Sequence, residues 1–136
     1  MIYESKVQFT TIDRNGNDKV VRHGYIVSEA DTFGDAEEQS YGVISGVTDA
    51  DVVDVRRSKL KEIINHRTSD EQMIYMADVA DIRINDEGEQ TEIVYKVALF
   101  AKDLDDAYNK VKVWLEQDYN MVALGVKKTK FNDIIS

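Results

Sequence analysis

Apolar and polar residues alternate at the start of the chain, with the period of two that is typical of a half-buried strand. One face of this strand carries Tyr3, Ser5, Val7, Phe9 and Thr11. Residues 13–18 (Asp-Arg-Asn-Gly-Asn-Asp) follow as a turn in which a glycine can take a positive φ. A return strand over about 19–28 then completes a predicted β-hairpin.

The same pattern occurs again in the second half of the chain. Residues 85–88 (Asn-Asp-Glu-Gly) form a turn of similar composition. The strand after it, over about 90–100, is rich in residues that favour β-structure. These residues are Thr91, Ile93, Val94, Tyr95 and Val97. We therefore predict a second hairpin equivalent to the first.

Each hairpin is followed by residues with helical spacing. In the second half, the apolar face consists of Leu104, Ala107, Tyr108, Val111, Trp114 and Leu115. Asp103 is a suitable N-cap, and Asp105 and Asp106 place negative charge in the first turn, where the helix dipole favours it. The equivalent helix in the first half, over 31–45, contains Gly34 and Gly42. Because glycine inside a helix costs about 1 kcal/mol relative to alanine, we expect this helix to be shorter.

A third strand is predicted in each half, over about 50–56 and about 121–127. Both strands lead into segments that we interpret as short helices, over 58–65 and 129–135. The predicted unit is therefore strand, strand, helix, strand, short helix, and it occurs twice.

Identical residues at a fixed spacing indicate a tandem duplication. Six residues recur 72 positions later, and after a slip of one residue six more recur 71 positions later. The first set is Met1, Ile2, Tyr3, Val7, Ile12 and Gly16, which recur as Met73, Ile74, Tyr75, Val79, Ile84 and Gly88. The second set is Asp35, Ala36, Val55, Lys59, Ile63 and Ile64, which recur as Asp106, Ala107, Val126, Lys130, Ile134 and Ile135.

These patterns predict an α+β fold in a single domain, 1–136. Its halves are 1–64 and 73–135, and 65–72 is a polar linker. One half alone could bury its apolar face only marginally, so we expect the halves to fold together. Two arrangements remain open: an antiparallel-rich sheet with helices packed on one face, or two small layered units sharing a core. Either one should have a pseudo-two-fold axis.

Several segments resemble an uncharacterised domain-of-unknown-function family that is common in Bacteroidetes genomes, their mobile elements and their phages. The segments that are similar to the family are Tyr3-Glu4-Ser5-Lys6-Val7-Gln8-Phe9, Asp31-Thr32-Phe33-Gly34-Asp35-Ala36-Glu37, Val53-Asp54-Val55-Arg56-Arg57-Ser58 and Gly125-Val126-Lys127-Lys128-Thr129-Lys130-Phe131. The chain departs from the family at Lys127 and Lys128, because acidic residues are common at some of these positions. The resemblance spans the chain but implies no reaction, cofactor or catalytic set.

Composition narrows the function classes. The chain has 136 residues, no cysteine and no proline, and a formal net charge of −9. The absence of cysteine excludes a disulfide framework, a thiolate metal site and a cysteine nucleophile. The alternating N-terminus is neither a signal peptide nor a membrane span. We therefore expect a soluble, cytoplasmic protein with no membrane partner, and the negative charge opposes broad adhesion to nucleic acid.

Two equivalent basic clusters are the strongest candidate binding site. They consist of Arg56, Arg57, Ser58 and Lys59 in the first half and of Lys127, Lys128, Thr129 and Lys130 in the second. Cations beside a hydroxyl at the start of a short helix could bind an anion, because the first N–H groups of a helix are free. A nucleotide, a cyclic dinucleotide or a nucleic-acid backbone would suit such a pair of sites. The simpler interpretation is that Ser58 and Thr129 cap helices and the cations balance neighbouring carboxylates.

Other chemistry is less well supported by the sequence. Neither the carboxylates at 49–54 and 103–106 nor the turn at 13–18 matches the spacing of an EF-hand. His23 and His66 have no partner at metal-ligand or triad spacing. Five aromatic residues are candidates for a base-stacking platform: Tyr3, Tyr75, Tyr95, Tyr108 and Trp114. Most of them are in phase with core positions, so we expect core packing to be their role.

We therefore expect a non-enzymatic, acidic interaction module without a cofactor or a metal, in a phage or mobile-element context. Its partner would be another protein or a second copy of the chain, for which an edge strand of the sheet is a suitable surface. Binding of a nucleotide or nucleic acid through the basic clusters is the second function class. A small hydrolase is the third, and it would require two close carboxylates in a cleft.

Overall fold

A computed structural model of the chain describes residues 1–118 and 120–136, which form eight strands and two helices. The fold is α+β, as predicted. It divides into two compact units, which are Met1–Ser58 with Phe131–Ser136 (unit 1) and Lys59–Lys130 (unit 2). Among the described residues, no helix is long and apolar enough to cross a membrane.

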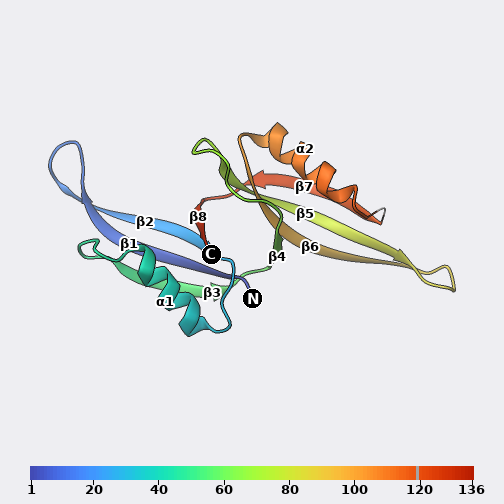
Figure 1. The fold of residues 1–136 in the computed structure, drawn as a ribbon, viewed down its shortest axis with the longest axis horizontal. Helices are drawn as coiled ribbons and strands as arrows, with labels where there is room; N and C mark the ends of the chain where they lie inside the picture. Colours follow the sequence, from blue (N-terminus) through green and yellow to red (C-terminus); the bar gives the residue numbers. More distant parts are fainter. Residues whose placement is uncertain (119) are drawn as a thin grey trace. The chain divides into compact units, whose positions relative to one another are not determined.

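Unit 1 is a four-stranded sheet with one helix on one face. Its elements are β1 (Tyr3–Ile12), β2 (Asp18–Val27), α1 (Phe33–Val43), β3 (Asp51–Arg57) and β8 (Phe131–Ile135). The strand order is β3-β1-β2-β8, and β8 is parallel to β2 whereas the other neighbours are antiparallel. Helix α1 lies over β1 and β3 (Figure 1).

Unit 2 has the same layers. Its elements are β4 (Leu60–Ile63), β5 (Met73–Ile84), β6 (Gln90–Ala101), α2 (Leu104–Leu115) and β7 (Met121–Lys128). The strand order is β4-β6-β5-β7, with β4 parallel to β6 and the other neighbours antiparallel. The boundaries of the units fall at 58/59 and 130/131, outside the predicted linker 65–72.

Asx-type turns close the two hairpins, in agreement with the predicted turns. The Asp13 carboxylate accepts hydrogen bonds from the backbone N–H groups of Asn15 and Asn17, and Gly16 has a φ of 80°. In unit 2, the Asn85 side-chain oxygen accepts from the N–H groups of Glu87 and Glu89, and Gly88 takes the same φ. Glycine supplies this positive φ without steric cost.

Side-chain caps start both helices. The Thr32 hydroxyl accepts from the N–H of Asp35 at 3.0 Å, and the Asp103 carboxylate accepts from the N–H of Asp106 at 2.8 Å. Asp103 is the predicted cap. Helix α1 ends at Val43, so it is shorter than the predicted range of 31–45.

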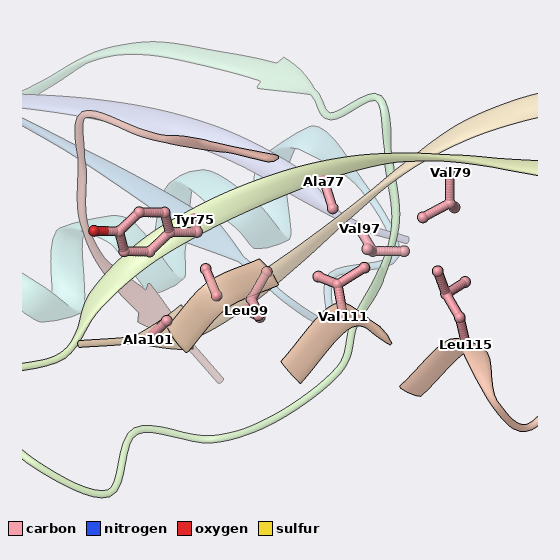
Figure 2. Packing of buried hydrophobic residues seen from close by; sticks show 9 residues of the cluster. Tyr75, Ala77, Val79, Val97, Leu99, Ala101, Val111 and Leu115 are labelled. Carbon is pink, nitrogen blue, oxygen red and sulfur yellow. The ribbon is translucent and has the colours of Figure 1, made fainter. Parts of the chain in front are cut away.

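Apolar side chains from the sheet and the helix meet in each unit. In unit 2, Val111 and Leu115 of α2 point toward the alternating residues of β5 and β6 (Figure 2). The buried cluster consists of Tyr75, Ala77, Val79, Val97, Leu99, Ala101, Ala107, Val111 and Leu115. Unit 1 has two smaller clusters, formed by Tyr3, Val27, Ala30 and Ala36 and by Val7, Tyr25 and Ile44. The alternation of the sequence thus defines the face that each helix covers.

The predicted short helices at 58–65 and 129–135 are wrong, because these segments contain the strands β4 and β8. Each strand adds to the sheet of the other half, β4 beside β6 and β8 beside β2. Isolated helices of one or two turns are marginal, whereas an added strand pairs the backbone groups of a sheet edge. After β4, Asn65 continues the pairing, since its amide bonds the backbone C=O and N–H of Phe100 at 2.9 and 2.7 Å.

Matching residues take equivalent positions in the two units. Val55 lies opposite Ser5 and Val126 lies opposite Ala77, and each sheet has a register shift two residues further on. Ala36 and Ala107 are both fully buried at the fourth position of their helices. The equivalence is the one that a duplication requires, but the descent of both units from one ancestral unit stays a prediction.

Candidate functional site

The basic cluster of unit 1 lies at the end of β3 and forms local contacts. The Arg56 guanidinium is 2.5 Å from the Asp54 carboxylate, and this hydrogen bond lowers the pKa of Asp54. Arg57 contacts the sulfur of Met1. The backbone N–H of Ser58 donates to the carbonyl of Ile2 at 2.9 Å. The contacts of Arg56 and Ser58 therefore belong to the sheet and its surface.

The basic cluster of unit 2 is more open. Thr129 is bound to β5, since both its hydroxyl and its N–H donate to the Ile74 carbonyl, at 2.8 and 3.0 Å. Lys127 and Lys128 are exposed and lie opposite Met76 and Tyr75 in the neighbouring strand. Unlike Arg56, which lies opposite Glu4, these two lysines have no carboxylate opposite them in the strand pair.

The predicted role of Ser58 and Thr129 as helix caps is wrong, because strands and not helices follow them. The N–H of Ser58 donates to the Ile2 carbonyl, and the N–H of Thr129 donates to the Ile74 carbonyl. The predicted anion site relied on free N–H groups at the start of a helix, and these two N–H groups do not supply them. Lys59 and Lys130 are exposed at the points where the chain passes from one unit to the other. What remains of the candidate anion site is the charge of the exposed side chains.

The carboxylates singled out in the sequence have structural roles. Asp103 caps α2, and Asp106 accepts from the N–H of Lys102 and from the Lys110 ammonium. Asp51 accepts from the Tyr41 hydroxyl at 2.6 Å, and this bond raises the pKa of Tyr41. Within residues 1–118 and 120–136, no three His, Cys, Asp or Glu side chains are placed to hold a metal ion.

The aromatic residues divide into packed and exposed groups. Tyr3 and Tyr75 are buried in the cores, while Tyr95 and Trp114 pack at the edge of the unit 2 core. Tyr108 is an exception to the prediction, because its side chain is 47% exposed. The Tyr108 ring lies beside Lys112 of the same helix, whose ammonium is 5.4 Å from the ring centre.

An edge strand was expected as a binding surface, but the sequence did not indicate which strands form the edges. Among residues 1–118 and 120–136, β3 and β7 each pair on one side only, as do the shorter strands β8 and β4 at the opposite ends of the sheets, so each sheet has an open antiparallel edge beside its helix. In an antiparallel pair, the backbone groups of alternate residues point away from the neighbouring strand. The bond from Ser58 to Ile2 fixes this alternation in β3, so the N–H groups of Val55 and Arg57 point outward. By the same argument, those of Val126 and Lys128 point outward in β7.

A groove of about 340 Å³ runs beside the open edge of unit 1, between α1 and β3. It is lined by Phe33, Gly34 and Glu37 from the helix and by Val52, Val53, Asp54 and Val55 from the strand. The Phe33 ring packs edge to face on Tyr3, with 5.0 Å between the ring centres, and still has 53% of its surface exposed. The groove thus combines apolar surface with unpaired backbone groups.

Two other hollows lie within single units. One, of about 400 Å³, is beside Trp114 in unit 2 and is lined by Ile64, Asn65, Asn109, Lys110, Val113, Trp114 and Gln117. The other, of about 530 Å³, is in unit 1 on the other flank of α1 and is lined by Met1, Glu29, Ala30, Asp31, Asp35, Glu38 and Gln39. The carboxylates of Glu29, Asp31, Asp35 and Glu38 make this flank of α1 strongly acidic.

Comparison with known proteins places the chain in a family. A family model described as Domain of unknown function (DUF4494) matches residues 1–136. The curated proteins contain no match to the chain. The family description assigns no activity.

Proposed function

The chain belongs to the DUF4494 family, and we propose that it is a non-enzymatic interaction module that binds a protein partner at the open edges of its sheets. One observation carries the proposal: β3 and β7 are long edge strands that pair on one side only. Unpaired N–H and C=O groups in a row can receive an extended segment of another chain as an added strand.

Two surface carboxyls, Asp54 and Asp106, have pKa shifts that do not suit acid–base catalysis. A general acid at neutral pH needs a raised pKa. Asp54 and Asp106 have the opposite shift, because Arg56 stabilises the ionised form of the first, and the Lys102 N–H and then Lys110 stabilise that of the second. Both carboxyls therefore stay ionised and serve as fixed negative charges.

Panning of a random peptide library on the purified chain tests the proposal. We expect enriched peptides that slow the exchange of the outward N–H groups of β3 or β7. Arg57→Pro and Lys128→Pro each remove one of these donors without touching a bond of the sheet, so the variant in the edge that is used should bind at least about tenfold more weakly. Arg57→Ala and Lys128→Ala keep the N–H and serve as controls.

The result against the proposal is that peptides bind both proline variants as well as the natural chain, or that no peptide protects either edge. Self-association is the other form of protein contact at these edges. It would be recognised as a mass that rises with concentration in sedimentation and falls in a proline variant.

A second candidate function is anion binding by the basic clusters, in particular by Lys127, Lys128 and Lys130. The observation in its favour is that the first two lysines lie opposite uncharged residues, which leaves their charge less balanced than that of Arg56. Thermal shift with nucleotides, cyclic dinucleotides and short oligonucleotides tests it. A stabilisation that disappears in the double variant Arg57→Ala and Lys128→Ala would support this function, and the absence of any shift would reject it.

We further propose a cytoplasmic location and a phage or mobile-element context in Bacteroidetes. The support for the context is the resemblance of the four sequence segments described above. The support for the location is the lack of cysteine and the acidic composition. Neighbouring genes that encode phage or conjugation proteins would support the proposed context. Fractionation of the source cells would test the proposed location.

A further inference from the structure

We propose that the groove between α1 and β3 binds an extended, lysine- or arginine-containing segment of a partner protein, which adds to the sheet of unit 1 as a strand beside β3. This inference rests on the proposed function and specifies the edge and the chemistry of the partner. It depends on three features of the groove: its backbone donors, its apolar wall and its charge.

The backbone donors set the position of the incoming segment. The N–H groups of Val55 and Arg57 point away from β1, and a strand added there would lie about 4.8 Å from β3. Every second side chain of that strand faces the side of the sheet that carries α1. These side chains enter the groove, so the residues that line the groove can discriminate between partner sequences.

The wall of the groove favours apolar side chains at those positions. Phe33 and Val53 are both large apolar residues with about half of their surface exposed, at 53% and 45%. Gly34 leaves free space on the helix side of the groove, because a methyl group added there would meet only the Thr32 hydroxyl, at 3.7 Å. A valine or leucine of the incoming strand would cover apolar surface that is otherwise in water.

The charge of the groove selects basic residues next to these apolar ones. Helix α1 contains Asp35, Glu37 and Glu38 and no basic residue. Glu37 lines the groove, and Asp51, which accepts a hydrogen bond from Tyr41, directly precedes the lining residue Val52. The hydrogen bond to Asp51 and, with a smaller effect, the negative charge of Glu37 raise the pKa of Tyr41, so both carboxylates lie near its hydroxyl. A cation there is attracted by both.

The corresponding surface of unit 2 lacks this chemistry. By the spacing of 71 residues, Tyr108 replaces Glu37 and Asp105 replaces Gly34. Helix α2 also carries Lys110 and Lys112, whereas α1 carries no basic residue. Both β3 and β7 end in two basic residues, so the helices and not the strand ends make the difference. A basic segment should therefore choose β3 and not β7.

Two synthetic peptides test the inference on the full-length chain. The probe is an acetylated and amidated octapeptide of alternating lysine and valine, and its counterpart has glutamate in place of lysine. Binding is followed by NMR titration and amide exchange at physiological salt. We expect the lysine peptide to slow exchange at Val55 and Arg57 and to bind at least about tenfold more tightly than the glutamate peptide.

Matched variants separate a specific site from general charge attraction. Glu37→Lys reverses the charge in the groove, whereas Glu38→Lys makes the same change on the same helix, at a residue that lines the other hollow. We expect the first variant to weaken binding at least about fivefold and the second by less than about twofold. Gly34→Gln, which narrows the groove at an open position, should also weaken binding.

Equal effects of Glu37→Lys and Glu38→Lys would overturn the inference, as would protection at Val126 and Lys128 of β7 instead of at β3. In the second case the proposed function would stand, because a peptide would still add to a sheet edge. If neither the octapeptides nor peptides from the library protect either edge, the inference and the proposed function both fail.

Discussion

A buried pair of hydroxyls distinguishes the core of unit 1 from that of unit 2. Ser40 is fully buried, and its hydroxyl lies 2.8 Å from both the Ser5 hydroxyl and the Ala36 carbonyl. The equivalent positions in unit 2 hold Ala77 and Val111, which pack without polar groups. Serines at these positions weaken an apolar signal in the sequence, yet the alternation of β1 still places Ser5 on the buried face.

Removing one partner of this pair should cost more than removing both. In Ser40→Ala the buried Ser5 hydroxyl loses a partner, and we expect a loss of about 1–3 kcal/mol in the free energy of unfolding of unit 1. The double variant Ser5→Ala and Ser40→Ala should lose less. Because the only tryptophan, Trp114, is in unit 2, amide exchange in β1 is the suitable measurement. A double variant as unstable as the sum of the two single variants would contradict this account of the pair.

At the scale of elements, the long strands and the helices agree with the sequence prediction to within about two residues at most ends. Alternation, turn glycines and caps are local signals, and they were sufficient for β1, β2, β5, β6 and α2. The segments 58–65 and 129–135 were assigned wrongly for a physical reason. Leu60, Ile63 and Ile64 have helical spacing, but the partner strand of β4 lies in the other half of the chain, where no local pattern reveals it.

The start of α2 makes the stability of unit 2 sensitive to acid. The N–H of Lys102 and then the Lys110 ammonium, 3.1 Å away, lower the pKa of Asp106 below its usual 3.8. A carboxyl with a lowered pKa in the folded state stabilises the protein above the unfolded value of 3.8, and this contribution is lost as the pH falls through the folded value.

Asp106→Asn should therefore lower the urea midpoint of unit 2 at pH 7, and the variant should lose less stability than the natural chain when the pH is lowered to 3. Fluorescence of Trp114 reports on this unit directly. Asp105→Asn, at the preceding exposed position, is the control and should change the midpoint less. Equal pH dependence in the natural chain and in Asp106→Asn would contradict the assigned role of the carboxyl.

At the scale of the whole molecule, each sheet is completed by a strand from the other half of the chain. Strand β8 forms the second edge of the unit 1 sheet, beside β2, and β4 forms the second edge of the unit 2 sheet, beside β6. This arrangement could not be predicted from the repeat, which only indicates that the halves are similar. The groove between α1 and β3 was missed for the same reason, since an open edge is a consequence of strand order.

Two fragments distinguish the observed units from the predicted halves. Fragment 59–130 contains every element of unit 2, whereas fragment 73–135 lacks β4 and leaves β6 as an open edge. We expect the first fragment to unfold at a higher urea concentration, because it keeps the buried Leu60 and the pairing of β4 with β6. A higher midpoint for fragment 73–135 would show that β4 contributes nothing to unit 2.

Amide exchange of the free, monomeric chain tests most directly the claim that the sheets end in open edges. We predict that the N–H groups of Val55 and Arg57 exchange quickly, while that of Arg56, which points toward β1, is protected. The same alternation is expected in β7, with fast exchange at Val126 and Lys128 and protection at Lys127. Uniform protection along β3 and β7 in the monomer would contradict the account, because it would mean that both edges are already occupied.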